Sequence, residues 1–473
     1  MNSTGMFFRQ YDLACLSLYS YLIGDTSTGR AVVIDPQRDI SEYLADAKAN
    51  GLKIERVIET HFHADFLSGH LELAAATGAV ISYGSIAKPD FEMEPLADGQ
   101  VLPLGEVTLE IRHTPGHTPE SISIVVRPQA DAQPWAVLTG DTLFIGDVGR
   151  PDLLTSVGRT AESLAHDLHE SLQNKLLTLP DTTLVYPAHG AGSACGKHMS
   201  TAASSTIGEQ RATNYALAPM TEEQFIAAVT EGQSVAPLYF AFAADANRRE
   251  RELLDDQQPP AALTIDDLRA LGDEVVVIDT RPSESFASGH LRGSINVGLD
   301  GRFAEYAGNV LRPGQRVVIV GDTGRATEAK VRLARIGFDD VVGAVDNVER
   351  VLLENPGLAE SAKRLPATDV RDWIAEDNTV QIVDVRNTGE TSVGGALPGA
   401  QMIPLPQLLA HLDKLDPTRP TIVYCSGGYR SAVAASVMRA HGFTAVADMI
   451  GGYDAWIAKF ANQNSSAQAA TDV

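Results

Sequence analysis

Cysteine is scarce in this sequence, which places only Cys15, Cys195 and Cys425 in 473 residues. An odd number of widely spaced cysteines argues against a disulfide framework, so each cysteine has to be explained by its own surroundings. Cys15 lies in an apolar strand segment, and we interpret it as core packing.

Long apolar runs are also missing. No segment has about 18 uninterrupted apolar residues, and residues 1–21 lack the basic segment and clean apolar core of a signal peptide. We therefore expect a non-exported, cytoplasmic protein with no membrane partner.

Basic residues are few relative to acidic ones, with 37 Lys and Arg against 61 Asp and Glu, a net charge of -24 and a pI of about 4.8. This balance argues against a nucleic-acid partner. The hydrophobic fraction of 44% is normal for a globular protein, and at about 150 residues per domain the length suggests about three domains. We also expect a homo-oligomer.

The first informative stretch follows the apolar segment 56–60, which predicts a buried strand. His61, His63 and Asp65 come directly after it, and imidazoles and a carboxylate at a strand end can converge on one metal ion. A polar loop without a metal is the alternative for this motif taken alone.

Three later loops repeat the same plan, because His117, Asp141 and His189 each lie in a loop that follows a predicted strand. Helical spacing predicts helices over residues 39–50 and 67–76. Four loops of this kind in sequence order favour a shared metal site over unconnected polar surface.

These motifs resemble the metallo-β-lactamase fold, an αββα sandwich, and within it the persulfide dioxygenases related to the ethylmalonic encephalopathy protein. The resemblance covers about residues 6–250, and we place the first domain at 1–250. The matching motifs are Thr60 to Asp65, Thr114 to Thr118, Gly140 to Leu153 and Pro187 to Ser193.

The resemblance implies a single Fe(II) per chain with His61, His117 and Asp141 as its ligands. Such a triad leaves positions open for O2 and for a low-molecular-weight persulfide, such as glutathione persulfide, which would be oxidised to sulfite and a thiol. His63, Asp65 and His189 are then candidates for orienting the ligands by hydrogen bonds, or are simply satisfied polar core residues.

Position 66 departs from the dinuclear hydrolases of this fold, the glyoxalase II type, which have a histidine where this chain has Phe66. Losing that ligand favours a mononuclear site. A zinc-dependent thioester hydrolase with an accessory sulfurtransferase domain remains the alternative, and zinc remains possible as the metal.

Two further residues are candidates near the metal. Arg150 matches the family motif and can bind a substrate carboxylate, although a structural pair with Asp152 explains it equally well. Cys195 follows the His189 loop, so it either accepts sulfane sulfur or is a passive small residue.

The C-terminal half contains an internal repeat with an offset of 105 positions, which relates Asp279 to Asp384, Arg316–Arg325 to Thr421–Arg430 and Gly337 to Gly442. Strand–helix alternation predicts a parallel sheet in each copy. The two copies resemble rhodanese sulfurtransferase domains over residues 259–358 and 363–462, with residues 245–260 as the linker from the first domain.

In the second copy Cys425 lies at a strand end and Arg430 starts the next helix. Backbone N–H groups from Ser426, Gly427, Gly428 and Tyr429, together with Arg430, can surround the sulfur and stabilise a persulfide anion. A buried structural cysteine is the alternative. The loop is one residue shorter than in phosphatases of this fold, which favours sulfur transfer.

In the first copy Val320 replaces the cysteine, so we expect a structural, docking or orienting role there. Taken together, the sequence predicts an iron persulfide dioxygenase fused to an inactive and an active rhodanese domain, serving sulfide detoxification. Tethering raises the local concentration of an intermediate, so sulfite can combine with the Cys425 persulfide to give thiosulfate, or Cys425 can supply the iron site. A sulfane-sulfur sensing module is the non-enzymatic alternative.

Overall fold

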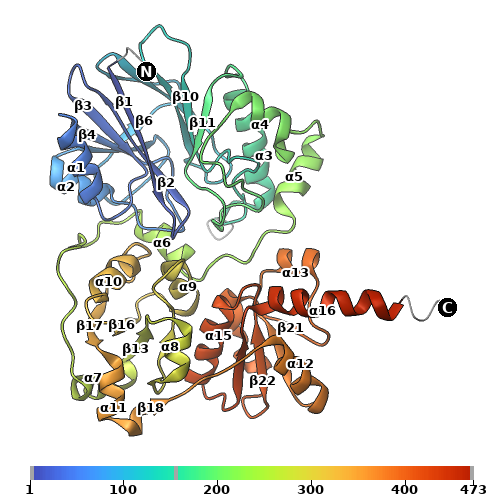
Figure 1. The fold of residues 1–473 in the computed structure, drawn as a ribbon. Helices are drawn as coiled ribbons and strands as arrows, with labels where there is room; N and C mark the ends of the chain where they lie inside the picture. The colour runs from blue at the N-terminus through green and yellow to red at the C-terminus, as the bar shows by residue number, and fades with distance from the viewer. Residues whose placement is uncertain (1–4, 154–157, 469–473) are drawn as a thin grey trace. The chain divides into compact units, whose positions relative to one another are not determined.

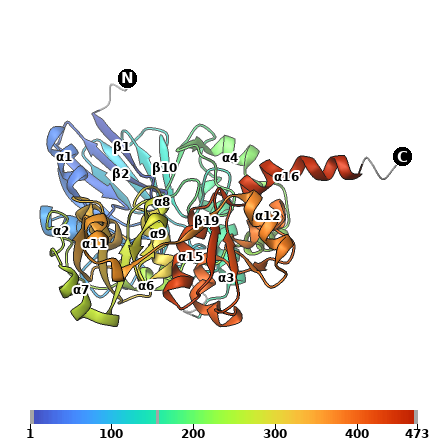
Figure 2. The ribbon, with the colours of Figure 1, turned by 60° about the horizontal axis from the view of Figure 1, so that its bottom comes forward.

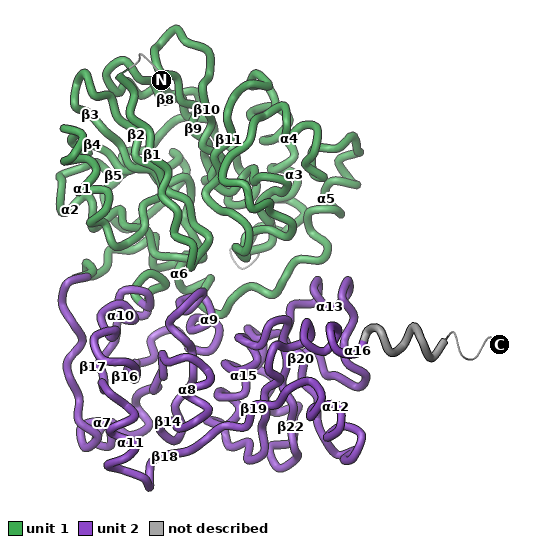
Figure 3. The backbone as a smooth tube through the Cα atoms, viewed as in Figure 1, with its two compact units in different colours: residues 1–255, 334–337 green, residues 256–333, 338–473 purple. Residues whose placement is uncertain are grey.

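The computed structural model describes residues 5–153 and 158–468, which fall into two compact units (Figures 1 and 3). Unit 1 comprises residues 1–255 and 334–337, and unit 2 comprises residues 256–333 and 338–473. None of the helices within the described residues is long and apolar enough to cross a bilayer.

Unit 1 is built on two six-stranded sheets, ordered β1-β2-β3-β4-β5-β6 and β12-β11-β10-β9-β8-β7. The strands of the first sheet are β1 (Met6–Leu13), β2 (Leu18–Asp25), β3 (Arg30–Ile34), β4 (Lys53–Ile58), β5 (Val80–Gly84) and β6 (Glu94–Leu96). Those of the second are β7 (Val101–Leu104), β8 (Val107–His113), β9 (Ile122–Arg127), β10 (Ala136–Gly140), β11 (Leu184–Pro187) and β12 (Ser205–Thr206).

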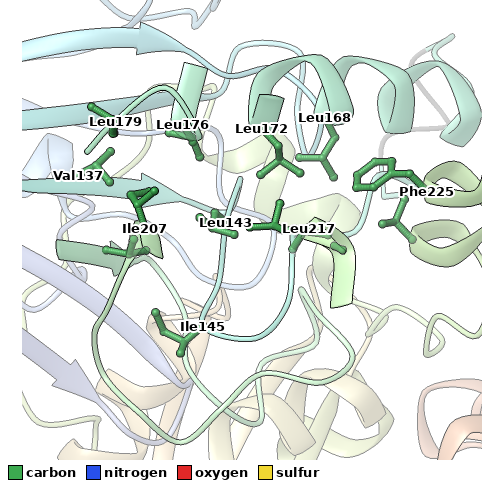
Figure 4. Packing of buried hydrophobic residues seen from close by; sticks show 14 of the residues in the cluster. Val137, Leu143, Ile145, Leu168, Leu172, Leu176, Leu179, Ile207, Leu217 and Phe225 are labelled. Atoms are coloured by element: carbon green, nitrogen blue, oxygen red, sulfur yellow. The ribbon is translucent and has the colours of Figure 1, made fainter. Parts of the chain in front are cut away.

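Helices cover the outer faces of both sheets (Figure 1). They are α1 (Ser41–Ala49), α2 (His70–Thr77), α3 (Ala161–Ser171) with its π-helical extension η2 (Leu172–Leu176), α4 (Ile207–Thr213), η3 (Tyr215–Leu217) and α5 (Glu222–Thr230). Helix α6 (Phe240–Ala246) lies beyond the ends of the strands instead. The cluster in Figure 4 joins Val137 of β10 to Leu168 of α3 and Phe225 of α5.

The buried side chains of β2 show why the layers form. Tyr21 and Ile23 point into the core between the two sheets, whereas Leu22 packs towards α1 and α2 with Tyr43 and Leu73. Successive strand residues face opposite sides, so a strand that is apolar on both sides must be covered on both. Unit 1 is therefore the predicted αββα sandwich.

Helix α2 starts at His70, three residues later than predicted from Leu67. The Gly69 N–H donates to the Pro36 carbonyl, Ser68 pairs with Gln37 in an isolated bridge, and a Cβ on Gly69 would lie 2.2 Å from the Gln37 oxygen. These contacts hold residues 67–69 as a loop, because the loop after β3 approaches too closely for a helical turn.

Unit 2 contains two parallel sheets of the same plan, ordered β15-β13-β16-β17 and β19-β23-β22-β20-β21. Its strands are β13 (Val275–Asp279), β14 (His290–Leu291), β15 (Ile295–Asn296), β16 (Arg316–Gly321), β17 (Val341–Asp346), β18 (Ala359–Glu360), β19 (Lys363–Leu365), β20 (Gln381–Asp384), β21 (Gln401–Met402), β22 (Thr421–Tyr424) and β23 (Val446–Met449).

The helices of unit 2 flank these sheets (Figure 2). They are α7 (Ile265–Leu271), η4 (Gly272–Glu274), α8 (Ser283–Ser288), α9 (Phe303–Val310), α10 (Ala326–Ala334), α11 (Val348–Glu354), η5 (Pro356–Leu358), α12 (Ala367–Glu376), α13 (Thr388–Gly394), η6 (Leu405–Gln407), α14 (Leu408–His411), η7 (Leu412–Lys414), α15 (Tyr429–Ala440) and α16 (Gly452–Gln468).

The repeat found in the sequence is also a structural repeat. Strands β13 and β16 pair in the first sheet as β20 and β22 pair in the second, with Asp279 opposite Val320 and Asp384 opposite Tyr424. The two rhodanese-like domains with parallel sheets are thus confirmed, as two copies of one α/β plan within unit 2.

Candidate metal centre and cysteine site

Three strand-end residues of unit 1 meet at one buried point. His61 follows β4, His117 follows β8 and Asp141 follows β10, and each is 1% exposed. The Nε2 atoms of His61 and His117 lie 3.7 and 3.4 Å from Asp141 Oδ2. His61 Nε2 and Asp141 Oδ2 have no hydrogen-bond partner. Buried polar atoms are normally paired, so this donor set fits a bound cation.

The second nitrogens of both histidines are held so that each Nε2 lies near Asp141 Oδ2. The Thr60 hydroxyl donates to Asp35 Oδ2 at 2.9 Å, so its oxygen accepts a hydrogen bond from His61 Nδ1, also at 2.9 Å. His117 Nδ1 donates to the Arg150 carbonyl at 2.8 Å. With the proton on Nδ1, each Nε2 carries the lone pair that a metal requires.

Local electrostatics put His61 and Asp141 in their metal-binding protonation states. Burial and the neighbouring His63 hold the pKa of His61 well below its ordinary value, so the ring is neutral. Burial alone would raise the pKa of Asp141, but His189 and His61 outweigh it and lower that pKa strongly. A carboxylate and neutral imidazoles are the forms that bind metal ions.

His63 is not part of this triad, but one of its ring nitrogens lies within 4.8 Å of ligand atoms of Asp65 and His189. Its Nε2 lies 3.2 Å from Asp35 Oδ1 and 3.5 Å from Glu59 Oε2, and the Phe66 ring centroid lies 4.4 Å from its own. Burial lowers the pKa of His63, but the two carboxylates outweigh it and raise the pKa to about 10. A protonated His63 holds Asp35, the residue that orients Thr60 and so His61.

Asp65 and His189 form a chain that ends on Asp141. His189 Nδ1 donates to Asp141 Oδ1 at 2.7 Å, and His189 Nε2 lies 2.7 Å from Asp65 Oδ2 without the alignment of a hydrogen bond. The chain fixes the Asp141 carboxylate. It is also where a second cation would bind, since Asp65 Oδ1 has no hydrogen-bond partner.

Arg150 and Cys195 both lie in this buried region. The Arg150 guanidinium binds both oxygens of Asp152 at 2.7 Å, and Arg150 is 2% exposed. This is the structural pair given above as the alternative, and a contact between Arg150 and a substrate stays a prediction. Cys195 is buried beside Asp141 and His189. Burial and the carboxylates of Asp65 and Asp141 raise the pKa of its thiol well above the ordinary value.

The second site, in unit 2, surrounds Cys425 at the end of β22. The Gly428 N–H donates to Cys425 Sγ at 3.1 Å, and Ser431 Oγ lies 3.6 Å from the sulfur. Gly428 has φ +98°, which a side chain would oppose, and α15 begins at the next residue. The Gly428 N–H thus contacts the sulfur, while the contacts predicted for Ser426, Gly427 and Tyr429 stay predictions.

Arg430 is held by a residue that the sequence did not single out. Its two terminal nitrogens donate to Glu390 Oε2 and Oε1, each at 2.6 Å. Tyr429 Oη donates to the Gly298 carbonyl of the first rhodanese-like domain. In that domain Val320, the repeat equivalent of Cys425, is fully buried in β16.

The supporting residues were missed for a common reason. Asp35 and Thr60 are 25 positions apart, and Glu390 and Arg430 are 40 positions apart. Each pair forms only after separate strands or helices have packed.

Comparison with known proteins agrees with this geometry. The Metallo-beta-lactamase superfamily profile matches residues 14–189, and the Rhodanese-like domain profile matches residues 264–347 and 366–459. Persulfide dioxygenase ETHE1, mitochondrial, of Bos taurus is 34% identical over 235 residues, covering 49% of this chain and 83% of that protein.

A second relative, the cytoplasmic hydroxyacylglutathione hydrolase of Arabidopsis thaliana, is 35% identical over 173 residues, covering 36% of this chain and 63% of that protein. A crystal structure titled metallo-beta-lactamase, from Staphylococcus aureus subsp. aureus COL, is 33% identical with a TM-score of 0.67, covering 72% of this chain and 99% of that one.

The fold and the His/Asp cluster thus define a metallo-β-lactamase superfamily domain followed by two rhodanese-like domains. Within that superfamily the chain belongs to the family of the ETHE1 persulfide dioxygenases.

Proposed function

We propose that this chain oxidises a low-molecular-weight persulfide, such as glutathione persulfide, with O2 at a single Fe(II) site and passes sulfane sulfur through Cys425 to give thiosulfate. The reaction would serve sulfide detoxification. The observation that carries the proposal is the buried triad His61, His117 and Asp141, with unpaired atoms aimed at one point.

The two proposed steps balance. In the first, RSSH, O2 and H2O give RSH, sulfite and two protons, so the terminal sulfur is oxidised and O2 is reduced. In the second, the Cys425 thiolate takes the outer sulfur of another RSSH molecule, whose inner sulfur leaves with the proton as RSH, and sulfite then attacks the outer sulfur of the resulting Cys425 persulfide anion. One S–S bond forms, the other breaks, and its electron pair leaves with the Cys425 thiolate.

The residues around the triad support this chemistry. An Fe(II) ion held there supplies the redox chemistry that lets O2 react with sulfur, and two histidines with one carboxylate are the usual protein ligands for it. Thr60 keeps His61 in the required tautomer, and His189 holds Asp141 through its second oxygen. Burial of all three ligands keeps bulk water from the site.

The alternative is a zinc-dependent thioester hydrolase of the glyoxalase II type. The pair Asp65 and His189 beside Asp141 favours a second ion, and a hydroxyacylglutathione hydrolase is among the relatives. Against it, Phe66 offers no ligand atom at the position where the glyoxalase II type has a histidine, and it packs on the His63 ring.

Oxygen uptake by Fe(II)-reconstituted protein on addition of glutathione persulfide tests the proposal. We expect uptake by the wild type and a loss of about 100-fold or more in His117→Ala, because removing one of three ligands dismantles the site. The number of metal ions per chain should be measured on the same samples.

Absence of uptake with any persulfide would refute the dioxygenase. Two zinc ions per chain and oxygen-independent hydrolysis of a glutathione thioester would then establish the hydrolase. If function survived in His117→Ala without metal, the sensing module would be favoured.

A further inference from the structure

The cation of the Cys425 loop is already neutralised. Arg430 is the only basic residue between positions 425 and 430, and both of its terminal nitrogens bind the Glu390 carboxylate. The two side chains are 17% and 34% exposed, so the pair is partly shielded from solvent. A fork-to-fork pair of this kind is the strong form of a charge-assisted hydrogen bond.

Glu390 is itself held in place from its own helix. The Asn387 N–H, at the start of α13, donates to Glu390 Oε2 at 2.9 Å in a capping box. Burial would raise the pKa of Glu390, but Arg430 outweighs it and lowers that pKa, so the carboxylate is charged at neutral pH. Arg430 therefore faces a fixed anion of the protein.

A second carboxylate touches the other end of the loop. The Ser426 hydroxyl lies 3.0 Å from both oxygens of Asp454, near the start of α16. Arg430, Glu390 and Asp454 together carry one net negative charge. Because Asp454 is exposed, its field is screened by salt and Glu390 has the larger effect.

Sulfite reaches Cys425 and thiosulfate leaves it as anions, so these charges affect how tightly both bind. This inference rests on the sulfur transfer proposed above. We propose that Glu390 is a specificity-determining residue that competes with sulfur oxyanions for Arg430 and keeps their affinity for the Cys425 site low. Thiosulfate formed at Cys425 then leaves, and free sulfate or thiosulfate does not fill the site.

A low affinity for sulfite is sufficient at Cys425, because sulfite would be formed on the same chain. The tether keeps the local sulfite concentration high, so tight binding is not needed for capture. Tight binding of a dianionic product would only slow its release.

Protection of Cys425 from alkylation measures anion affinity without any turnover. Full-length protein is treated with iodoacetamide at fixed ionic strength over a series of sulfate concentrations, and the Cys425 peptide is quantified by mass spectrometry. We expect Glu390→Gln to lower the sulfate concentration for half-protection by about tenfold, because two guanidinium N–H groups become available. Thiosulfate should show the same shift.

Three controls make the result specific. Glu376→Gln, at the exposed end of α12, changes the net charge equally and should leave the midpoint unchanged. Glu390→Gln combined with Arg430→Met should lose the gain, because the anion needs the guanidinium. Circular dichroism confirms that each variant is folded.

An unchanged or higher midpoint in folded Glu390→Gln would overturn the proposal, as would a gain that survives Arg430→Met. If Glu390→Gln does not fold, Glu390→Ala is measured by the same criterion. The assay needs neither iron nor O2, so its outcome is independent of whether the dioxygenase proposal holds.

Discussion

At the scale of single residues, Thr60 links two buried groups that could not otherwise act together. It donates to Asp35 and accepts from His61, and so fixes the tautomer of one metal ligand. His63 anchors Asp35 from the other side. The residues after β4 thus include one candidate ligand, His61, the residue that orients it directly, Thr60, and His63, which acts on it through Asp35.

Thr60→Val should therefore weaken metal binding while keeping the side-chain shape. We expect the Fe(II) dissociation constant to rise by about 10 to 100-fold, the usual effect of losing a residue that orients a ligand. Competition with a chromophoric chelator measures it. Thr183→Val is the matched control, because the Thr183 hydroxyl is buried with no hydrogen-bond partner. Equal affinities in the two variants would contradict the role given to Thr60.

The three candidate metal ligands could be predicted because each follows a recognisable apolar strand. Cys425 could be predicted because its strand recurs in the 105-residue repeat. Asp35, Glu59 and Glu390 could not, since nothing local distinguishes them from other carboxylates in an acidic chain. Their roles arise from long-range packing: Asp35 follows β3, which pairs with the β4 strand leading to Thr60. Sequence thus identifies donors better than the residues that orient them.

At the scale of elements, the loop that follows β10 folds back tightly on its own start. A Cβ added to Gly149 would lie 1.9 Å from the Asp141 carbonyl oxygen and 3.1 Å from His117 Cβ. The Gly149 backbone therefore touches the segments that carry two of the three ligands. The absence of a side chain lets them approach each other.

Gly149→Ala should displace the Asp141 loop. We expect loss of most bound iron and a fall of about 1 to 3 kcal/mol in the free energy of unfolding, as overpacking of a rigid site usually costs. Metal analysis and urea unfolding measure the two effects. Gly357→Ala is the control, because a Cβ there meets nothing within 4 Å, and it should change stability by less than about 0.5 kcal/mol. Full iron content in Gly149→Ala would show that the loop can yield.

Element boundaries were harder to predict than element types. The helix expected from Leu67 begins at His70, because Gly69 is pressed against the Gln37 carbonyl by a loop more than thirty positions upstream. The repeated strands of unit 2, by contrast, were found where the 105-residue offset placed them, because two copies report the same pattern independently.

At the scale of the whole molecule, the candidate metal ligands belong to unit 1 and Cys425 to unit 2, so the chain would join the two proposed chemistries. Covalent linkage would make the transfer between the two sites effectively intramolecular. This holds whether sulfite moves to Cys425 or persulfide sulfur moves from Cys425 to the iron site. A variant that stops only one of the chemistries can therefore reveal how they are coupled.

Cys425→Ser should leave oxygen consumption within about twofold of the wild type and change the product from thiosulfate to sulfite, because the iron ligands are intact and the sulfur carrier is lost. Bimane labelling and chromatography at limiting persulfide measure both products. Sulfite mixed with persulfide without protein gives the uncatalysed background, which must be subtracted. Thiosulfate above that background would show that Cys425 does not form it. A parallel loss of oxygen uptake would instead mean that Cys425 delivers persulfide sulfur to the iron site.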